Sequence, residues 1–528
     1  MTRIDERVST HVYKVKRISK EEMESIAGVC LYDQPPFCNA ACPLKLDVKA
    51  MLKAAAENDF KKAFKIYESI APFPLILSAG CGAPCEEKCR LCELGDGIAI
   101  GDIERAVALS GGAGEKRSIF RVRKKKKAAV FGSGLFALLL AGELEKKGYP
   151  VTVICGEANE EEYLRVAAGF LREDDFYTEL KRLRGKDIAF EFNAEMTREL
   201  FEEKRGGFDV LCASEKAALD IFPGAVRDEG IMLMESEGLL TGGGETVLEA
   251  ALGARKAALT ADRLAQGIDP RSARGEEGPV TSRLYTNPDL ARGLIRIKGC
   301  ESGYTREQAA EEAGRWMQCH CDECLRGCAY LRRFNKHPGL LSREIYNNTQ
   351  IIMGDHPLNR AMNACALCGQ CTVTCPHGFD MAHVCRTARE NMVDTDKMPL
   401  AAHEFALLDM LFSNGEAYLC RKQPGHSHCR YVFFPGCQAA AIAPEAVIAA
   451  YEDLCTRLKG GVALMLGCCG AIAHWAGRGE MYGEVRDKIA AELAALEDPV
   501  IIAGCPSCMK LLSEQDMAET VGIWTVLR

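Results

Sequence analysis

The stretch that decides the fold of the second half of this chain is Cys365-Ala-Leu-Cys368-Gly-Gln-Cys371-Thr-Val-Thr-Cys375-Pro376. Its spacing, C-x2-C-x2-C-x3-C-P, is that of loops that wrap a 4Fe–4S cubane. Three closely spaced sulfurs hold one cluster, and the fourth cysteine reaches a neighbouring cluster. Zinc sites usually pair shorter cysteine units that are set further apart. The pattern therefore favours iron–sulfur clusters over zinc.

A second cysteine run lies upstream, Cys319-His-Cys321-Asp-Glu-Cys324-Leu-Arg-Gly-Cys328. It departs from the first run because it opens with C-x-C and has Ala329 in place of the proline. In two-cluster ferredoxins the fourth cysteine of each run serves the other cluster. We therefore expect two 4Fe–4S centres, one held by Cys319, Cys321, Cys324 and Cys375, the other by Cys328, Cys365, Cys368 and Cys371. His320 is expected to lie beside its cluster rather than to bind it.

The chain has 528 residues, 27 of them cysteines, and a formal net charge of −8. The mild acidity argues against a nucleic-acid-binding protein, whose binding domain is usually strongly basic. The N-terminal residues lack the apolar core of a secretory signal, and no apolar run approaches the length of a membrane span. We therefore expect a cytoplasmic protein, in which clustered cysteines are metal ligands or redox groups rather than disulfides.

Two further groups of cysteines lie near the N-terminus. The first contains Cys30, Cys38 and Cys42-Pro43, and the second contains Cys81, Cys85, Cys89 and Cys92. Neither group completes a four-sulfur site of ordinary spacing, so we expect the two to fold together. The sequence Ile100-Gly-Asp-Ile-Glu104 follows them.

These groups resemble the N-terminal iron–sulfur domain of the bacterial glutamate synthase small subunit and of dihydropyrimidine dehydrogenase. That family uses C-x2-C-x4-C-x3-C-P, a later cysteine trio, and an I-G-x-(L/I)-(E/Q) helix that supplies one ligand without sulfur. The resemblance implies one cluster held by Cys42, Cys81, Cys85 and Glu104, and a second held by Cys30, Cys38 and Cys89. The family's second cysteine is Asp33 here.

Three readings of the altered site stay open. Asp33 is an oxygen ligand, Cys92 takes its place, or the second cluster is absent or labile. The alternative for the whole segment is a helical docking domain with unoccupied cysteines.

A dinucleotide-type pattern follows. The sequence predicts a buried strand at Lys127–Phe131 and another strand at Pro150–Ile154. Between them, Gly132-Ser-Gly134-Leu-Phe-Ala137 predicts a turn that leads into a helix. This is the context in which a pyrophosphate binds a helix N-terminus. Gly132, Gly134 and Ala137 are therefore candidate cofactor-binding residues.

The segment around Gly242 and Gly243 resembles the closing flavin-contact segment of the same glutamate synthase family. Two departures matter. The position expected to bind ribose is Cys155, with Glu157 two residues on. Only about fifteen residues separate the strand predicted at 208–213 from Gly230, too few for a pyridine-nucleotide module. We expect a shortened, Rossmann-like FAD-type domain without its own NAD(P)H site. Whether FAD binds stays open, the alternative being a scaffold that spaces the clusters.

A last cysteine set follows apolar strands near the C-terminus, at Gly436-Cys437, Gly467-Cys468-Cys469-Gly470 and Cys505-Pro-Ser-Cys508. The strands are expected to bring all five sulfurs to one sheet edge. The set resembles the CCG domain of heterodisulfide reductase catalytic subunits and of related lactate and glycolate oxidase subunits. The resemblance implies a noncubane 4Fe–4S centre and candidate catalytic cysteines, although only one such motif is present. A plain cubane or zinc stays an alternative. His474 and Trp475 either line a substrate pocket or pack.

The other cysteines, at 155, 212, 300, 385, 420, 429 and 455, are expected to be small buried apolar residues. The basic run 121–127 is expected to be a solvated domain boundary, with docking of an acidic electron carrier as the weaker alternative.

We therefore predict a multidomain α/β protein with α-helical iron–sulfur domains. The predicted domains are a helical iron–sulfur domain (1–120), a Rossmann-like domain (121–290), a helical dicluster ferredoxin-like domain (291–395) and an α/β CCG domain (396–528). The predicted function is an iron–sulfur oxidoreductase subunit that carries electrons to or from the CCG centre. Its partners would be redox subunits that supply electrons from NAD(P)H or ferredoxin. The alternatives are a self-contained disulfide or thiol-conjugate reductase, and a non-redox scaffold or assembly protein.

Overall fold

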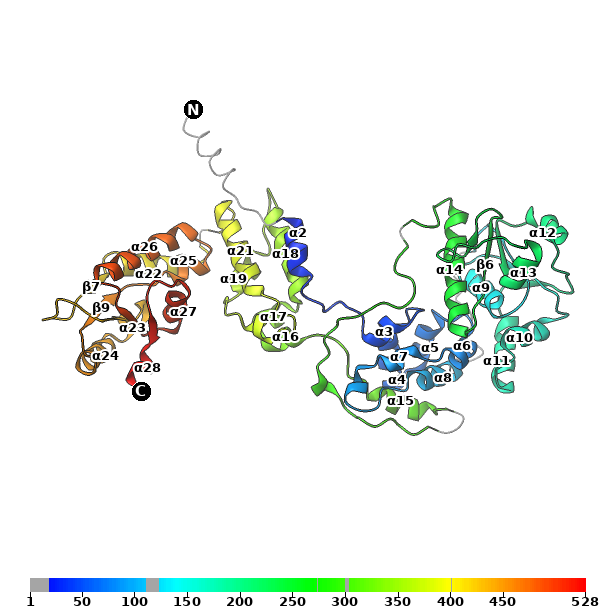
Figure 1. The fold of residues 1–528 in the computed structure, drawn as a ribbon, viewed down its shortest axis with the longest axis horizontal. Helices are drawn as coiled ribbons and strands as arrows, with labels where there is room; N and C mark the ends of the chain where they lie inside the picture. Colours follow the sequence, from blue (N-terminus) through cyan, green and yellow to red (C-terminus); the bar gives the residue numbers. More distant parts are fainter. Residues whose placement is uncertain (1–18, 111–122, 273, 300–302, 400) are drawn as a thin grey trace, which may run out of the picture. The chain divides into compact units, whose positions relative to one another are not determined.

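The computed structural model describes residues 19–110, 123–272, 274–299, 303–399 and 401–528 (Figure 1). The chain forms two compact units, one made of Met1–Leu31 with Asp322–Arg528 and the other of Tyr32–Cys321. The chain thus passes between the units twice. Cys300 and the first residues of the basic run at 121 lie outside the described residues, as does the N-terminal decapeptide.

The unit Tyr32–Cys321 begins with a helical part. Its helices are α3 (Phe37–Ala41), α4 (Val48–Ala56), α5 (Phe60–Glu68), α6 (Pro74–Gly80), α7 (Pro84–Glu87), η1 (Arg90–Glu93) and α8 (Ile100–Ser110). Asp47 and Asp59 accept hydrogen bonds from N–H groups in the first turns of α4 and α5, which fixes where both helices begin. The much later helix α15 (Arg306–Gly314) packs against α4 and α8.

The same unit contains a six-stranded sheet in the order β3-β2-β1-β4-β6-β5. Its strands are β1 (Ala128–Phe131), β2 (Val151–Ile154), β3 (Ile188–Glu191), β4 (Val210–Ser214), β5 (Leu233–Met234) and β6 (Leu239–Gly242). The neighbouring strands β3, β2, β1, β4 and β6 all run parallel to one another, whereas the edge strand β5 is antiparallel to β6. Every residue of β1 is buried, as expected for a central strand covered on both faces.

Helices connect these strands. They are α9 (Leu135–Lys146), α10 (Glu160–Ala168), α11 (Glu173–Arg184), α12 (Arg198–Arg205), α13 (Glu215–Ile221) and α14 (Val247–Gln266), with the short η2 (Pro288–Leu290) beyond them. The longest, α14, starts at a reciprocal capping box between Thr246 and Glu249 and packs along α9.

The other unit begins with a helical bundle. Its members are α2 (Lys20–Ala27), α16 (Glu323–Gly327), α17 (Ala329–Phe334), α18 (Pro338–Gln350), α19 (Asn359–Ala364), α20 (Gln370–Thr374) and α21 (Met381–Asp394). The N-terminal α2 lies beside α18, which also packs on α21 (Figure 1). Leu341, Ile345, Met362 and Val384 form part of the buried core between these helices.

A five-stranded sheet completes this unit, in the order β11-β10-β8-β9-β7. Its strands are β7 (Leu419–Arg421), β8 (Tyr431–Phe434), β9 (Val462–Leu466), β10 (Val500–Ala503) and β11 (Thr520–Gly522). The helices of this part are α22 (Glu404–Asn414), α23 (Cys437–Ile442), α24 (Pro444–Arg457), α25 (Ala471–Trp475), α26 (Gly479–Ala495), α27 (Pro506–Glu514) and α28 (Ile523–Leu527). The central strands β10, β8 and β9 are parallel, so their carboxyl ends share one edge.

The predicted multidomain α/β architecture with helical parts is confirmed, and β8, β9 and β10 are the apolar strands predicted before the CCG cysteines. Among the helices of the described residues, none combines the length and the apolar character that a membrane crossing needs.

Candidate iron–sulfur sites

The first candidate site lies among the N-terminal helices and unites Cys42, Cys81, Cys85 and Glu104. Each of the three thiols interacts electrostatically with the Glu104 carboxyl, which is almost fully buried on α8. Burial raises the pKa of Glu104 to about 8, against the opposing effect of the nearby Tyr67 hydroxyl. Burial also raises the pKa of Cys81 to about 12. Such groups ionise readily only when a bound cation compensates their charge, so this donor set fits an iron–sulfur cluster.

The Tyr67 hydroxyl supports that fit. It is wholly buried beside Glu104, Cys42 and Cys81 and interacts with the Glu104 carboxyl, although no hydrogen bond of ordinary geometry joins the two. Buried hydroxyls normally find a partner. A cluster sulfur or a ligating thiolate beside Glu104 would provide an acceptor for this one.

The second N-terminal site differs from the predicted set. Cys38 and Cys89 lie near each other, and the third thiol that interacts with both is Cys319. Cys30 belongs to the other unit, where its side chain packs at Gly339 of α18. Asp33 is exposed.

Cys92 is exposed as well, and its thiol donates to the main-chain oxygen of Glu86 at 3.4 Å. Within the unit Tyr32–Cys321 the structure brings Cys38 and Cys89 of the predicted set together, and the ligand sets that include residues of both units stay predictions.

The two ferredoxin-like runs meet through α16 and α20, which are in contact. A Cβ on Gly327 would lie 2.9 Å from Oγ1 of Thr374, so this glycine permits the close approach. Cys328 and Cys375 end these helices in the same way, since each N–H donates to the cysteine four residues earlier. The symmetric arrangement is suited to two neighbouring clusters.

Two residues that the sequence did not single out surround Cys365. The thiol of Cys385, which we expected to be only a buried apolar residue, lies beside that of Cys365 and lowers the pKa of Cys365. The second residue is Arg389, whose guanidinium is buried on α21. It donates to the main-chain oxygens of Cys365, Met362 (2.8 Å) and Trp475 (2.6 Å). No carboxylate pairs with it among the described residues, and nothing in the helical pattern of 381–394 distinguishes it from a surface arginine.

The CCG cysteines gather at the shared edge of β8, β9 and β10. Hydrogen bonds link Cys437 to Cys468, Cys468 to Cys469, and Cys469 to Cys508. Cys505 joins them at Gly436, where a Cβ would lie 3.1 Å from the Cβ of Cys505.

The environment of these thiols fits a metal centre. The hydrogen bond with Cys468 and burial raise the pKa of Cys437 far above its usual range. Thiols so close together lose their protons together only if bound metal neutralises them. Of the other cysteines of this domain, Cys420 and Cys429 share the core cluster of the five, whereas Cys455 belongs to a separate cluster and interacts with Tyr451.

A cavity of about 480 Å³ opens beside the CCG edge. One wall is the loop around Cys368, and the opposite wall comes from the residues that follow the CCG cysteines. Its lining includes both His474 and Trp475, together with the cationic Arg386 and Lys510. His474 also accepts a hydrogen bond from Arg386 at 3.4 Å. His474 and Trp475 both line this cavity, and both also contact α21. The two roles considered for them, lining a pocket and packing, are therefore compatible.

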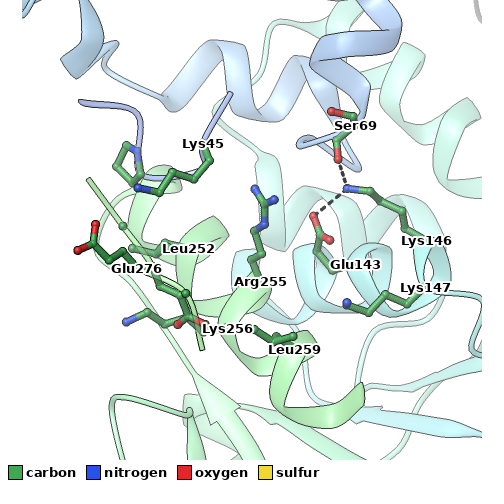
Figure 2. A pocket seen from close by; sticks show the side chains of 14 residues that line it. Lys45, Ser69, Glu143, Lys146, Lys147, Leu252, Arg255, Lys256, Leu259 and Glu276 are labelled. Carbon is green, nitrogen blue, oxygen red and sulfur yellow. Dashed lines mark hydrogen bonds and ion pairs between the residues drawn. The ribbon is translucent and has the colours of Figure 1, made fainter. Parts of the chain in front are cut away.

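A second cavity of about 480 Å³ adjoins the loop after Cys42 (Figure 2). Its lining is rich in cationic side chains, namely those of Lys45, Lys146, Lys147, Arg255 and Lys256. Figure 2 shows Arg255 between Lys45 and Glu143, and Lys146 bound to Ser69 and Glu143. The side-chain amines of Lys45 and Lys256 have no partner among the described residues.

The predicted dinucleotide turn lies between β1 and α9. A Cβ on Gly132 would lie 2.4 Å from Oγ of Ser214, so a side chain there would separate β1 from the start of α13. Gly134 has a φ of 103° and faces open space, and no side chain caps α9. Ser133 donates to Glu157. Gly242 packs on Phe136, and Gly243 on Glu215. The open N-terminus of α9 leaves room for a phosphate group.

Three family models match parts of the chain. They describe the 4Fe–4S domain II of dihydropyrimidine dehydrogenase (residues 7–112), a 4Fe–4S dicluster domain (317–380) and a cysteine-rich CCG domain (431–513). These matches confirm the resemblances drawn from the cysteine spacing. The chain is an iron–sulfur protein with domains for several 4Fe–4S clusters.

Curated relatives match shorter parts. The NADPH-Fe(3+) oxidoreductase subunit beta of Geobacter sulfurreducens is 28% identical over 230 residues, 41% of this chain and 33% of the relative. The NADP(+)-dependent formate dehydrogenase subunit beta of Moorella thermoacetica is 28% identical over 159 residues, 25% of this chain and 21% of the relative. The glutamate synthase (NADPH) small chain of Azospirillum brasilense is 29% identical over 148 residues, 26% and 30% of the two chains. The chain thus spans a third or less of the length of these relatives.

Proposed function

We propose that the chain is a subunit of a larger oxidoreductase complex and carries electrons between a partner protein and the CCG centre. The observation that supports this most directly is the link between two cysteine loops. Arg389 joins the Cys365 loop to the turn after Cys468 and Cys469 by hydrogen bonds to main-chain oxygens of both. A buried arginine bound in this way keeps the two loops at a fixed separation, which electron transfer requires.

The chain's own residues would set the properties of each centre. The clusters, when bound, supply one-electron redox chemistry at potentials that depend on their surroundings. Cysteine thiolates would hold the iron, and Glu104 would replace one of them at the first site. Hydroxyls such as that of Tyr67 would donate to sulfur, and Arg389 would add a positive charge. Both effects stabilise the reduced, more negative state.

A partner would supply or remove the electrons. The strand order β3-β2-β1-β4 is that of doubly wound dinucleotide-binding sheets, and the glycine turn before α9 is open. We propose that this domain binds FAD and no nicotinamide. The cationic cavity next to Cys42 is then the proposed contact for an acidic electron carrier, since Lys45 and Lys256 are unpaired there.

A second candidate function rests on the cavity between the Cys368 loop and the CCG edge. A cavity lined by Arg386, Lys510 and His474 suits an anionic substrate, such as a disulfide or thiol conjugate that bears carboxylates. Turnover of such compounds by the isolated chain with an artificial reductant would favour a self-contained reductase. Reduction of the clusters without turnover would favour the electron-carrying subunit.

Iron and sulfide analysis after anaerobic purification, together with flavin extraction, tests the proposal. We expect at least about eight iron atoms per chain, the content of two cubanes, and electron paramagnetic resonance signals that grow on reduction. A preparation that is folded but free of iron would instead support the scaffold alternative.

A further inference from the structure

We infer that Cys319 is a ligand of the second N-terminal cluster, together with Cys38 and Cys89. This inference rests on the proposed function only in requiring that clusters are bound. It moves Cys319 out of the ferredoxin-like set in which its sequence neighbours place it. It also supplies a thiolate where the related domains have a cysteine and this chain has Asp33.

A short series of contacts ties Cys319 to Cys38. The Cys38 thiol lies 3.7 Å from Oδ1 of Asn39. The same oxygen accepts a hydrogen bond from the N–H of Lys49 at 3.1 Å. The amine of Lys49 then donates to the main-chain oxygen of Cys319 at 3.5 Å. Cys38 and Cys319 are both buried in one core, although 281 positions separate them in sequence.

The segment that leads to Cys319 runs beside the Cys38 loop for some distance. The N–H of Val280 donates to the main-chain oxygen of Ala40 at 2.8 Å. The hydroxyl of Ser282 donates to the main-chain oxygen of Pro35 at 2.6 Å. These contacts hold residues 280–282, just before Thr286, against the chain on both sides of Cys38.

Thr286 provides an independent observation. Its hydroxyl is buried and has no oxygen or nitrogen partner among the described residues. The group that it interacts with is the thiol of Cys319. A hydroxyl in this position is suited to donate to a thiolate sulfur that binds iron.

The departure in spacing has a structural reason. A regular C-x2-C opening would place the first cysteine at 318, where the chain has Gln318 instead. Gln318 adopts the left-handed conformation, with a φ of 51°, so the backbone changes direction just before Cys319.

The other candidates for the missing ligand are less favourable. Asp33 is exposed, and Cys92 is exposed with its thiol directed to the main-chain oxygen of Glu86. Within the unit Tyr32–Cys321, Cys319 shares the buried core of Cys38 and interacts with both Cys38 and Cys89.

The test compares the full-length wild type, purified without air, with Cys38→Ala, Cys319→Ala and the double variant. We expect all three variants to lose the same electron paramagnetic resonance signal and about four iron atoms, with no further loss in the double variant. Cys324→Ala is the matched control from the same cysteine run. It should remove a different signal, and its iron loss should add to that of Cys319→Ala.

The inference is wrong if Cys319→Ala and Cys324→Ala remove the same signal, or if the losses of Cys319→Ala and Cys38→Ala add. Wild type without iron would refute the proposed function instead. Thr286→Val covers the case in which the alanine variants misfold. It should keep the iron content and lower the midpoint potential of the signal that Cys38→Ala removes. An unchanged potential of that signal would count against the inference.

Discussion

Arg389 and Trp475 are joined by a hydrogen bond of 2.6 Å from the buried guanidinium to the main-chain oxygen. The same guanidinium binds the main-chain oxygens of Met362 and Cys365. A single side chain thus connects the dicluster loop with the CCG turn. Burial lowers the pKa of Arg389, but an arginine stays protonated at any ordinary pH, so its charge is a fixed part of this connection.

Replacing Arg389 is therefore expected to affect both stability and potential. Arg389→Met leaves three main-chain oxygens without their donor, which should lower the free energy of unfolding by about 1–3 kcal/mol. The lost positive charge should lower the midpoint potential of the cluster held by Cys365. Urea unfolding and a redox titration measure the two effects. Arg386→Met, which removes a partly exposed arginine from the same helix, is the control and should change that potential less. Equal shifts in both variants would contradict the role of Arg389.

The signal of the CCG centre should change when Cys469 is replaced and stay unchanged when Cys455 is replaced. Cys469→Ala removes a thiol that hydrogen-bonds within the set of five, so the spectroscopic signal of the terminal centre should be lost or altered. Cys455→Ala removes a thiol of the same domain that lies apart from them, and it should leave every signal unchanged. An unaltered spectrum of Cys469→Ala would show that the CCG assignment is wrong.

The cationic cavity beside Cys42 should govern docking of an acidic electron carrier. Lys45→Glu combined with Lys256→Glu should slow reduction of the chain by a bacterial ferredoxin roughly tenfold at low ionic strength. The difference should shrink as salt is added, because salt screens exposed charges. Stopped-flow absorbance measures this rate. Lys459→Glu places the same charge change on an exposed lysine of the CCG domain, and an equal slowing there would argue against docking at this cavity.

Stability should fall on mild acidification because of His474. Burial and then Arg386 lower the pKa of its imidazole, and the ring accepts a hydrogen bond from Arg386 that protonation would break. The unfolded chain, with a pKa near 6.5, therefore binds more protons than the folded chain. Stability is retained above about pH 6.5 and declines below it.

His474→Gln keeps an acceptor but does not titrate. Its urea midpoint should therefore fall less than that of the wild type between pH 8 and pH 6. The exposed His426, replaced by glutamine in the same way, serves as the control and should show the wild-type dependence. A wild-type pH dependence in His474→Gln would exclude this residue as the cause.

Sequence spacing predicted the local elements well, whereas the long-range pairing of the cysteines stays a prediction. Strands such as β8 and β10 are short apolar runs between turn residues, so their bounds follow from composition. The CCG cysteines could be grouped because each follows a strand of one parallel sheet. Cys319 could not be placed in this way, because its position depends on contacts with residues near Cys38. Arg389 gave no signal for a related reason, since burial by a neighbouring domain leaves no mark on the helical pattern.

The position of α2 has a consequence for how the protein is made. Arg343 of α18 forms an ion pair with Glu24 of α2 at 3.0 Å, so α2 acquires this packing partner only when α18 has been synthesised. That is roughly 310 residues later, about 15–60 s at the usual rate of translation. In the interval the residues 32–321 can fold on the ribosome, while α2 still lacks α18. A nascent chain released early would therefore expose the buried face of Met23 and Ala27 and be a substrate for chaperones.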